Sequence, residues 1–390
     1  MNKKIKKLVA ILMTTVSISM VAVGCTNKTG DAGKQTVTKE SELKGLKIEK
    51  TLDLKYANNF QVDYYEDGFK VITDGSERKI MIVPEGKEAP KTEKEMTVLK
   101  QPIERAGVFS TTHATSVKAI NELDKVIMVT TDKKSWHMDQ IKSQMESGKT
   151  LYVGKNTAPD YEKIKEANPQ VIFVTTKSTH GGDEVTAKFD ELGIPWIAIR
   201  EHEESHPLGK VEWVKLFGAV FGKDDVAAEK FNEQEKKVLA VGKENENKDK
   251  PKVVQIFVSK GTVYVRNGGD YGAKMVELAG GNYSFSNVEP NKGGTSKMTV
   301  EEFYKQAIDA DVIIYDTTSD PSVKTISDIL KYGDYLADIK AIKEGRVWGV
   351  ASHYWQSADR MGEIIEDMSE AIHTPISEAK ASEFYFPLSK

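Results

Sequence analysis

Basic, aromatic and histidine side chains gather in loops that directly follow strand-length apolar runs. Arginine and lysine bind anionic groups, aromatic rings form flat apolar walls, and histidine binds metals or transfers protons. A single loop histidine is usually only solvated or hydrogen-bonded, so the concentration of such residues carries the prediction. We expect a ligand to contact His113, Trp136, His137, Lys177, His180, Arg200, Arg266, Tyr271, Tyr354, Trp355 and Arg360.

No catalytic motif accompanies these loops. The chain has no Gly-x-Ser-x-Gly elbow, phosphate loop, His-Glu-x-x-His pair or Rossmann glycine pattern. Carboxylate pairs such as Glu203-Glu204 are common by chance in an acidic chain and make only a weak case for hydrolysis. We therefore expect a binding protein that is not an enzyme.

Alternating strands and helices must position the loops. In the first half, apolar runs at 106–110, 126–130, 171–176 and 196–199 predict strands, with helices at 114–123, 139–146, 160–167 and 184–192 between them. After Pro251, strands are expected at 253–258, 262–265, 312–315 and 347–350, with helices at 272–279, 300–307, 323–331 and 359–373. This alternation predicts doubly wound α/β sheets, which bind ligands beyond the carboxyl ends of their strands.

One long helix is predicted between the two α/β regions. Asp224 and Asp225 suit a helix N-terminus, and an apolar stripe follows at Val226, Phe231 and Val238. At about 1.5 Å per residue such a helix spans roughly 30 Å, enough to bridge two lobes. We predict a β extension at 46–97, a first lobe at 98–222, the helix at 223–249 and a second lobe at 250–390, with the ligand cleft between the lobes.

The first residues form a targeting segment. Four lysines precede an apolar stretch at 8–23, which ends in small residues before Cys25, the only cysteine of the chain. Residues 1–24 are therefore a predicted signal peptide, and polar residues 25–45 a flexible tether. Removing 1–24 takes away four lysines and no acids, so the formal charge changes from −4 to −8. This balance does not favour nucleic acid as a partner.

Five features of the chain together resemble solute-binding lipoproteins of ABC importers, especially those for iron–siderophore complexes, haem or cobalamin. They are the Ala22–Cys25 lipobox, the 126–130 run, the 159–171 segment, the single bridging helix and the Arg346-Val347-Trp348 strand. The resemblance implies a diacylglycerol on Cys25 as the only covalent group, anchoring at the outer face of the cell membrane, and a monomer that passes ligand to a permease and its ATPase. It also implies that Glu162 and Glu301, with Glu302 beside it, dock the permease.

Several ligands remain open. An anionic ferric complex suits the cations Lys133, Lys134, Lys177, Arg200, Arg266 and Arg360. Haem would take an axial ligand from His113, His137, His180, His353 or Met138, and cobalamin would use the aromatic walls. A divalent zinc or manganese site built from histidines and a glutamate is a further alternative. A surface sensor or adhesion lipoprotein with the same fold and no transport role is the alternative from another functional class.

Overall fold

The computed structural model describes residues 41–92, 94–177 and 182–390. The predicted signal peptide, the lipidation site Cys25 and the ligand candidate His180 lie outside these ranges. The predicted tether 25–45 extends too far toward the C-terminus, because Leu43 is fully buried against the β extension. Within the described ranges, no helix combines the length and the apolar character needed to cross a bilayer.

The extension is a five-stranded sheet in the order β1-β2-β3-β4-β5. Its strands are β1 (Ile48–Thr51), β2 (Gln61–Tyr65), β3 (Lys70–Thr73), β4 (Lys79–Val83) and β5 (Thr97–Lys100), and only the β4–β5 pair is parallel. Asp67 and Gly68 have left-handed φ values of 61° and 80° between β2 and β3. Because β5 completes this sheet, the predicted boundary at 97/98 falls inside a strand.

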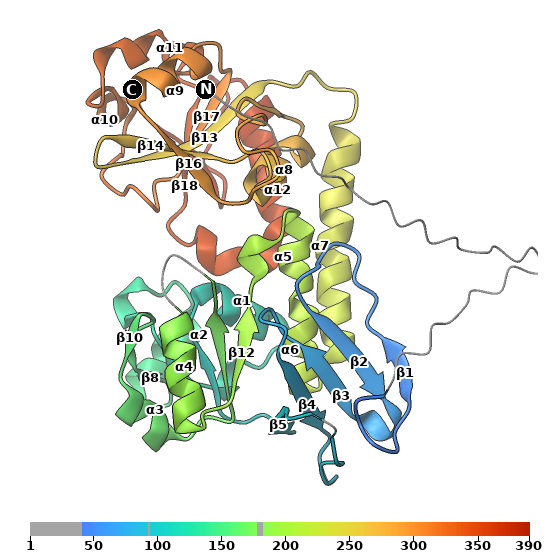
Figure 1. The fold of residues 1–390 in the computed structure, drawn as a ribbon. Coiled ribbons are helices and arrows are strands. Elements are labelled where there is room, and N and C mark those ends of the chain that lie inside the picture. The colour runs from blue at the N-terminus through green and yellow to red at the C-terminus, as the bar shows by residue number, and fades with distance from the viewer. Residues whose placement is uncertain (1–40, 93, 178–181) are drawn as a thin grey trace, which may run out of the picture. The chain divides into compact units, whose positions relative to one another are not determined.

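The N-lobe sheet is entirely parallel, in the order β12-β11-β6-β7-β8 (Figure 1). The strands are β6 (Ala106–Val108), β7 (Val126–Val129), β8 (Leu151–Tyr152), β11 (Val171–Thr175) and β12 (Trp196–Ile199), and a short hairpin joins β9 (Gly154–Lys155) to β10 (Ala158–Pro159). The helices are α1 (Thr111–Ala119), α2 (Asp139–Glu146), α3 (Tyr161–Ala167) and α4 (Asp183–Leu192). Strand order reverses between β6 and β11, as a doubly wound sheet requires.

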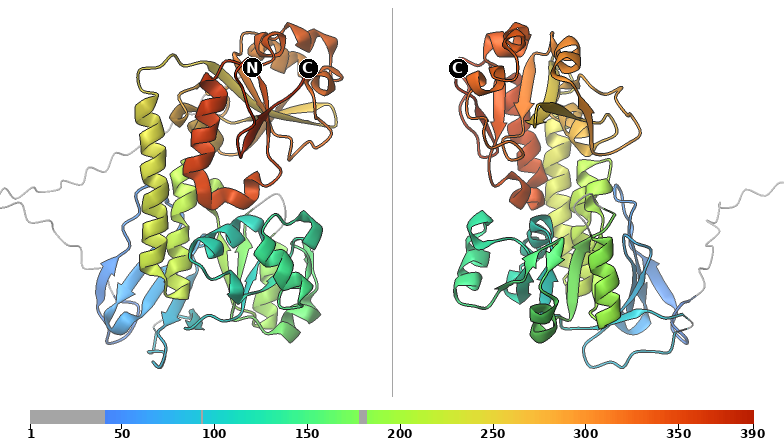
Figure 2. Two further views of the ribbon diagram at one scale, coloured as in Figure 1. Left: turned by 180° about the vertical axis from the view of Figure 1, so that it is seen from behind. Right: turned by 60° about the vertical axis from the view of Figure 1, so that its left-hand side comes forward.

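Helix α7 (Asp224–Glu244) joins the lobes, which confirms the predicted architecture. Its buried face contains the predicted apolar residues Phe231 and Val238 together with Gln234, whose side chain accepts a hydrogen bond from the Gly362 backbone at 2.8 Å. Two shorter helices precede it, α5 (Pro207–Glu212) and α6 (Val214–Phe221). Helix α7 packs against α6 on the N-lobe side and α12 (Met361–His373) on the C-lobe side (Figure 2).

The C-lobe sheet is mixed, with the order β16-β14-β13-β17-β18-β19 and β15 paired to β13. Parallel strands β13 (Lys252–Ser259), β17 (Val312–Tyr315) and β18 (Val347–Val350) form its centre, with β15 (Asn282–Tyr283) also parallel. Antiparallel strands β14 (Thr262–Arg266), β16 (Thr295–Met298) and β19 (Tyr385–Pro387) flank them. The helices besides α12 are α8 (Tyr271–Leu278), α9 (Val300–Ala307), α10 (Ile326–Leu330) and α11 (Lys340–Glu344). A 3-10 segment, η6 (Tyr354–Arg360), leads into α12. The α-helix predicted at 359–373 therefore begins at Met361, two residues later than predicted.

Candidate ligand-binding cleft

A hollow opens at the carboxyl ends of the central C-lobe strands. It encloses about 410 Å³ of space, part of it open to solvent. Strand order reverses between β13 and β17, the position at which open α/β sheets bind ligands. Its lining comprises Gln255, Ile256, Phe257, Tyr264, Arg266, Thr295, Ile314, Asp316, Val350, Tyr354, Trp355 and Tyr385.

Arg266, the last residue of β14, is the one cation of this lining. Its guanidinium carbon lies 5.8 Å from the ring centroids of both Tyr271 and Trp355. Asp270 is 3.8 Å away, but its two carboxylate oxygens already accept hydrogen bonds from the Gly272 and Gly294 backbones. Arg266 is therefore held at the hollow by aromatic rings and a distant carboxylate, with guanidinium N–H groups left for a ligand.

Aromatic rings give the hollow its apolar walls. Phe257 and Tyr264 stack with centroids 4.7 Å apart and planes 6° from parallel. Tyr354 and Trp355 meet edge to face at 5.0 Å, and the Trp355 indole donates a 2.8 Å hydrogen bond to Thr318 Oγ1. Because Thr318 also bonds Asp316, this chain of contacts fixes the indole orientation before a ligand arrives. The structure thus brings together four of the predicted candidates, Arg266, Tyr271, Tyr354 and Trp355.

Two N-lobe candidates are not at a surface, and the prediction for them is wrong. His113 is 1% exposed, with Nδ1 3.2 Å from the Phe173 carbonyl and Nε2 3.2 Å from Thr175 Oγ1. Burial lowers the pKa of His113, although Glu201 opposes this, so the ring is neutral at neutral pH. Trp136 is also 1% exposed, and its indole donates to the Thr131 carbonyl at 3.0 Å. Both side chains belong to the lobe core because the helix and loop after each strand fold back over the sheet.

Arg200 is a second correction. Its guanidinium donates to the Gly75 carbonyl of the β3–β4 turn at 2.9 Å and pairs with Glu203. The extension therefore bonds the Arg200 guanidinium, which was predicted to contact the ligand. Lys177 is exposed, with φ of 52°, beside the undescribed residues 178–181, and the structure makes no contact between it and the C-lobe hollow.

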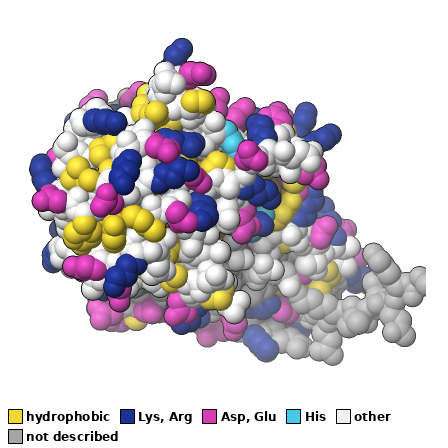
Figure 3. Space-filling model, turned by 90° about the horizontal axis from the view of Figure 1, so that it is seen from above, with side chains coloured by type: hydrophobic (Ala, Val, Ile, Leu, Met, Phe, Trp, Pro, Cys, Tyr) yellow, Lys and Arg dark blue, Asp and Glu magenta, His cyan; other side chains and the backbone are white. Residues whose placement is uncertain are grey.

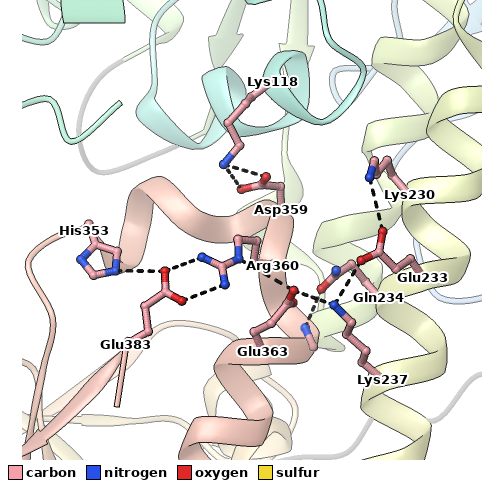
Figure 4. A network of polar contacts seen from close by, with 11 residues as sticks. Lys118, Lys230, Glu233, Gln234, Lys237, His353, Asp359, Arg360, Glu363 and Glu383 are labelled. Carbon is pink, nitrogen blue, oxygen red and sulfur yellow. Dashed lines mark hydrogen bonds and ion pairs between the residues drawn. The ribbon is translucent and has the colours of Figure 1, made fainter. Parts of the chain in front are cut away.

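Segment η6 of the C-lobe contacts the N-lobe through polar groups. The Gln356 amide accepts from the His137 backbone N–H and donates to the Ser135 carbonyl, both at 2.7 Å. Asp359 pairs with Lys118 of α1 at 2.8 Å (Figure 4). The rings of His137 and His353 face each other with centroids 6.1 Å apart, so His137 lies at the junction of the lobes.

Arg360 is a third correction, because it serves this network and not the hollow. Its guanidinium forms a bidentate ion pair with the Glu383 carboxylate and lies 3.8 Å from the Glu363 carboxylate (Figure 4). Glu363 in turn accepts from Lys237 of α7 at 2.7 Å. The network ties η6 and α12 to the bridging helix, and it leaves the Arg360 guanidinium already paired.

Sequence reasoning missed Lys210 and Glu201 as cleft residues. Lys210 lies on α5, with its ammonium 4.4 Å from the Tyr271 ring centroid. Glu201 accepts a 2.7 Å hydrogen bond from Thr112 Oγ1. Burial alone would raise the pKa of Glu201, but His113, Lys210 and the Thr112 hydrogen bond outweigh it and lower the pKa. Both line a second hollow with Asp359 between the lobes. The sequence signal that could have placed Lys210 on a helix is Pro207, which stands at the start of α5.

The described ranges offer little to a bare metal ion. Among residues 41–92, 94–177 and 182–390, no three His, Cys, Asp or Glu side chains are arranged to hold one. Of the predicted axial ligands for haem, His113 and Met138 are buried, whereas His137 and His353 are at least partly exposed. Among the candidates within the described ranges, those accessible to a tetrapyrrole therefore lie at the lobe junction.

The two predicted docking glutamates are exposed in the first turns of α3 and α9. Glu302 is held in a capping box with Thr299, at 2.8 and 3.1 Å, and its carboxylate is thereby committed. Glu301 lies beside Tyr335 on a surface groove and has no such role in the helix cap. On the face seen from above, basic and acidic side chains are interspersed without a field of one sign (Figure 3).

Comparison with known proteins gives one family and several structural relatives. A family model described as periplasmic binding protein matches residues 110–354. An uncharacterized lipoprotein of Methanocaldococcus jannaschii is 29% identical over 409 residues, covering 97% of this chain and 96% of the relative.

Solved structures at low identity share the fold. A haem-binding protein of Pseudomonas aeruginosa (15% identity, TM-score 0.58) covers 74% of this chain and 99% of its own, and the petrobactin-binding protein of Bacillus subtilis (14%, 0.56) covers 84% and 100%. A molybdate-binding protein of Haemophilus influenzae (15%, 0.59) covers 78% and 91%.

Proposed function

The chain belongs to the periplasmic binding protein family, and we propose that it is the ligand-capturing subunit of an ABC importer for an iron complex of the siderophore type. The observation that carries this function is the aromatic hollow around Arg266 at the strand-order reversal of the C-lobe. The hollow offers flat walls for a bulky chelate and one guanidinium for an oxygen of its periphery. Structural relatives named for petrobactin, for acinetobactin with ferric iron and for haem support an iron-containing ligand.

Capture would use the side chains of the C-lobe first. A chelate seated against Phe257 and Tyr264 would meet the Trp355 edge and Arg266, all oriented before binding. The N-lobe would then cover the ligand from the side of Lys210 and α1. Because α7 and the network through Arg360 and Lys237 link the lobes, we expect closure to be a small rotation.

No catalytic step belongs to this function. The carboxylates nearest the hollow are engaged in hydrogen bonds within the protein. Asp316 accepts from the backbone N–H groups and hydroxyls of Thr318 and Ser319, and Asp270 caps α8. A carboxylate that is saturated with local donors is a poor general base.

Delivery would use the exposed glutamates Glu162 and Glu301, which we propose to pair with basic residues of the permease. Diacylglycerol on Cys25 would hold the protein at the outer face of the membrane, close to that partner. The lipoprotein relatives of Methanocaldococcus jannaschii support the anchor.

A thermal-shift panel tests the ligand class. The full chain in detergent is heated with ferric hydroxamate and catecholate complexes, haem, cobalamin, Zn²⁺ and Mn²⁺. A ligand present at about 100 times its Kd stabilises by roughly 2.7 kcal/mol, which raises Tm by several degrees. A shift with a ferric complex supports the function. A shift confined to haem, cobalamin or a bare cation replaces the ligand, and no shift contradicts the transport role.

The docking role is tested by exchanging single glutamates. Glu162→Gln and Glu301→Gln should each lower uptake in cells about tenfold while leaving ligand affinity unchanged, because each removes one charge-assisted contact worth about 1.4 kcal/mol. Glu166→Gln, an exposed change on the same helix as Glu162, is the matched control and should leave uptake unchanged. Equal uptake by all three variants would contradict docking through these residues.

A further inference from the structure

The C-lobe hollow is electrically balanced. Its lining contains one basic residue, Arg266, and one acidic residue, Asp316. Asp270, which is not part of the lining, lies 3.8 Å from the Arg266 guanidinium. A ligand in this hollow therefore meets one cation and at least one anion, and no surplus of positive charge.

Three of the other five cations that the sequence placed around the cleft are paired with neighbouring carboxylates. Arg360 is paired through both amino groups with Glu383, and Arg200 is paired with Glu203. Lys133 lies 3.3 Å from Glu146. These three belong to the six cations that made a strongly anionic ligand attractive in the sequence.

The inter-lobe hollow repeats the balance. Its basic residues are Lys210 and Lys230, and its acidic residues are Glu201 and Asp359. Lys230 also lies 3.4 Å from Glu233 of its own helix. Closing the lobes over the C-lobe hollow would bring this balanced set of two basic and two acidic residues toward the ligand.

From this balance we infer that the ligand is an iron complex of little or no net charge, such as a tris-hydroxamate, with at most one anionic group directed at Arg266. The inference rests on the proposed function and names its substrate class. A triply anionic complex, such as a tris-catecholate, would have to lose its hydration in a hollow that supplies one guanidinium. Desolvating an ion without compensating charge is costly, and freeing Arg360 would leave Glu383 without its partner.

The aromatic lining supports the same conclusion. The stacked Phe257 and Tyr264 rings and the Trp355 indole present apolar area to the ligand. Such surfaces bind the hydrocarbon backbone of a neutral chelate by burial of apolar area.

Binding of two matched ferric complexes tests the inference. Quenching of tryptophan fluorescence in the full chain would be titrated with a neutral ferric tris-hydroxamate and with a triply anionic ferric tris-catecholate. We expect Kd for the tris-hydroxamate to be lower by at least about tenfold. Asp316→Asn, which removes one negative charge from the hollow, should tighten tris-catecholate binding severalfold. The exposed change Asp249→Asn, with the same change in net charge, is the control and should alter neither Kd.

Each outcome separates the substrate class from the function. Tighter binding of the tris-catecholate by the unmodified chain would overturn the inference and leave the importer role for iron complexes standing. An equal effect of Asp316→Asn and Asp249→Asn would overturn it too, because the charge of the hollow would then not control selection. Failure of both complexes to bind would overturn the proposed function for iron complexes, and the inference with it.

Discussion

At the carboxyl edge of the C-lobe sheet, Arg266 and Trp355 keep their side chains at an open hollow. At the corresponding edge of the N-lobe sheet, His113 and Trp136 are buried, and Arg200 is bonded to the extension. Both edges have similar residues after their strands, yet one keeps them at an open hollow and the other buries them or bonds them to the extension. The difference shows that a polar residue at a strand end stays available to a ligand only when no neighbouring element covers or bonds it.

The neighbour that bonds Arg200 at the N-lobe edge is the β extension. Glu212, fully buried on α5, accepts backbone hydrogen bonds from Lys55, Tyr56 and Ala57 at 2.8–3.0 Å. Glu204 does the same for Asn58 and Asn59 at 3.1–3.2 Å. The loop at residues 55–59 of the extension thus donates backbone hydrogen bonds to two buried carboxylates. These bonds attach to the N-lobe the sheet whose Gly75 carbonyl bonds Arg200.

The largest effect is expected from breaking this attachment. Glu212→Ala removes the acceptor of three backbone N–H groups and of Lys215, so the free energy of unfolding should fall by about 3 kcal/mol. Urea denaturation measures the loss. Glu229→Ala, an exposed change on α7, should stay within about 0.5 kcal/mol. A loss for Glu212→Ala no larger than for this control would show that the extension is not anchored there.

The second effect concerns ligand affinity and contrasts the two edges directly. Trp355→Ala should weaken binding of the ferric complex found in the thermal-shift panel by about 2 kcal/mol, roughly thirtyfold, because it removes a central aromatic wall. Arg200→Gln should change Kd by less than about twofold, since the Arg200 guanidinium already bonds Gly75 and Glu203. Fluorescence or calorimetric titration measures both. Comparable losses in the two variants would place the ligand on the N-lobe edge as well.

The smallest effect is a pH dependence where the extension meets α5. His206 caps α5 through a 3.1 Å hydrogen bond from the Leu208 N–H to Nδ1 and stacks on Tyr56 at 4.7 Å. Burial, with a smaller contribution from Lys274, lowers the pKa of His206 from 6.5 to about 4. The unfolded chain therefore binds the proton more tightly, so the stability that neutral His206 contributes is complete above pH 6.5 and is lost as pH falls toward 4.

The variant His206→Asn isolates the contribution of His206 titration to stability, because asparagine also caps a helix but does not titrate. Between about pH 7 and pH 4.5 the unmodified chain should lose about 1 kcal/mol more than the variant, a value reduced for the partial exposure of the ring. Urea denaturation at the two pH values measures the difference, and the remaining histidines affect both proteins alike. Identical losses would show that the capping imidazole is not kept neutral by its surroundings.

Most elements of the two lobes could be predicted from the sequence. Helix α2 and strand β17 have the predicted bounds, and α7 lies within its predicted segment, because apolar periodicity and helix caps are local signals. Strands β16 and β19 were not predicted. Strand β16 has a weak apolar pattern and β19 has only three residues, and they pair with β14 and β18 from other parts of the chain.

The sequence by itself determined the alternation of strands and helices, the bridging helix and the concentration of polar residues at the strand ends. Only the tertiary structure decided which of those residues stay available. Arg266 remains at the hollow because Asp270 is occupied by two backbone N–H groups, whereas Arg360 meets the Glu383 carboxylate and Arg200 meets the Gly75 carbonyl. Whether a charge is free depends on which groups from distant segments come within hydrogen-bonding distance, and residue type and spacing do not contain that information.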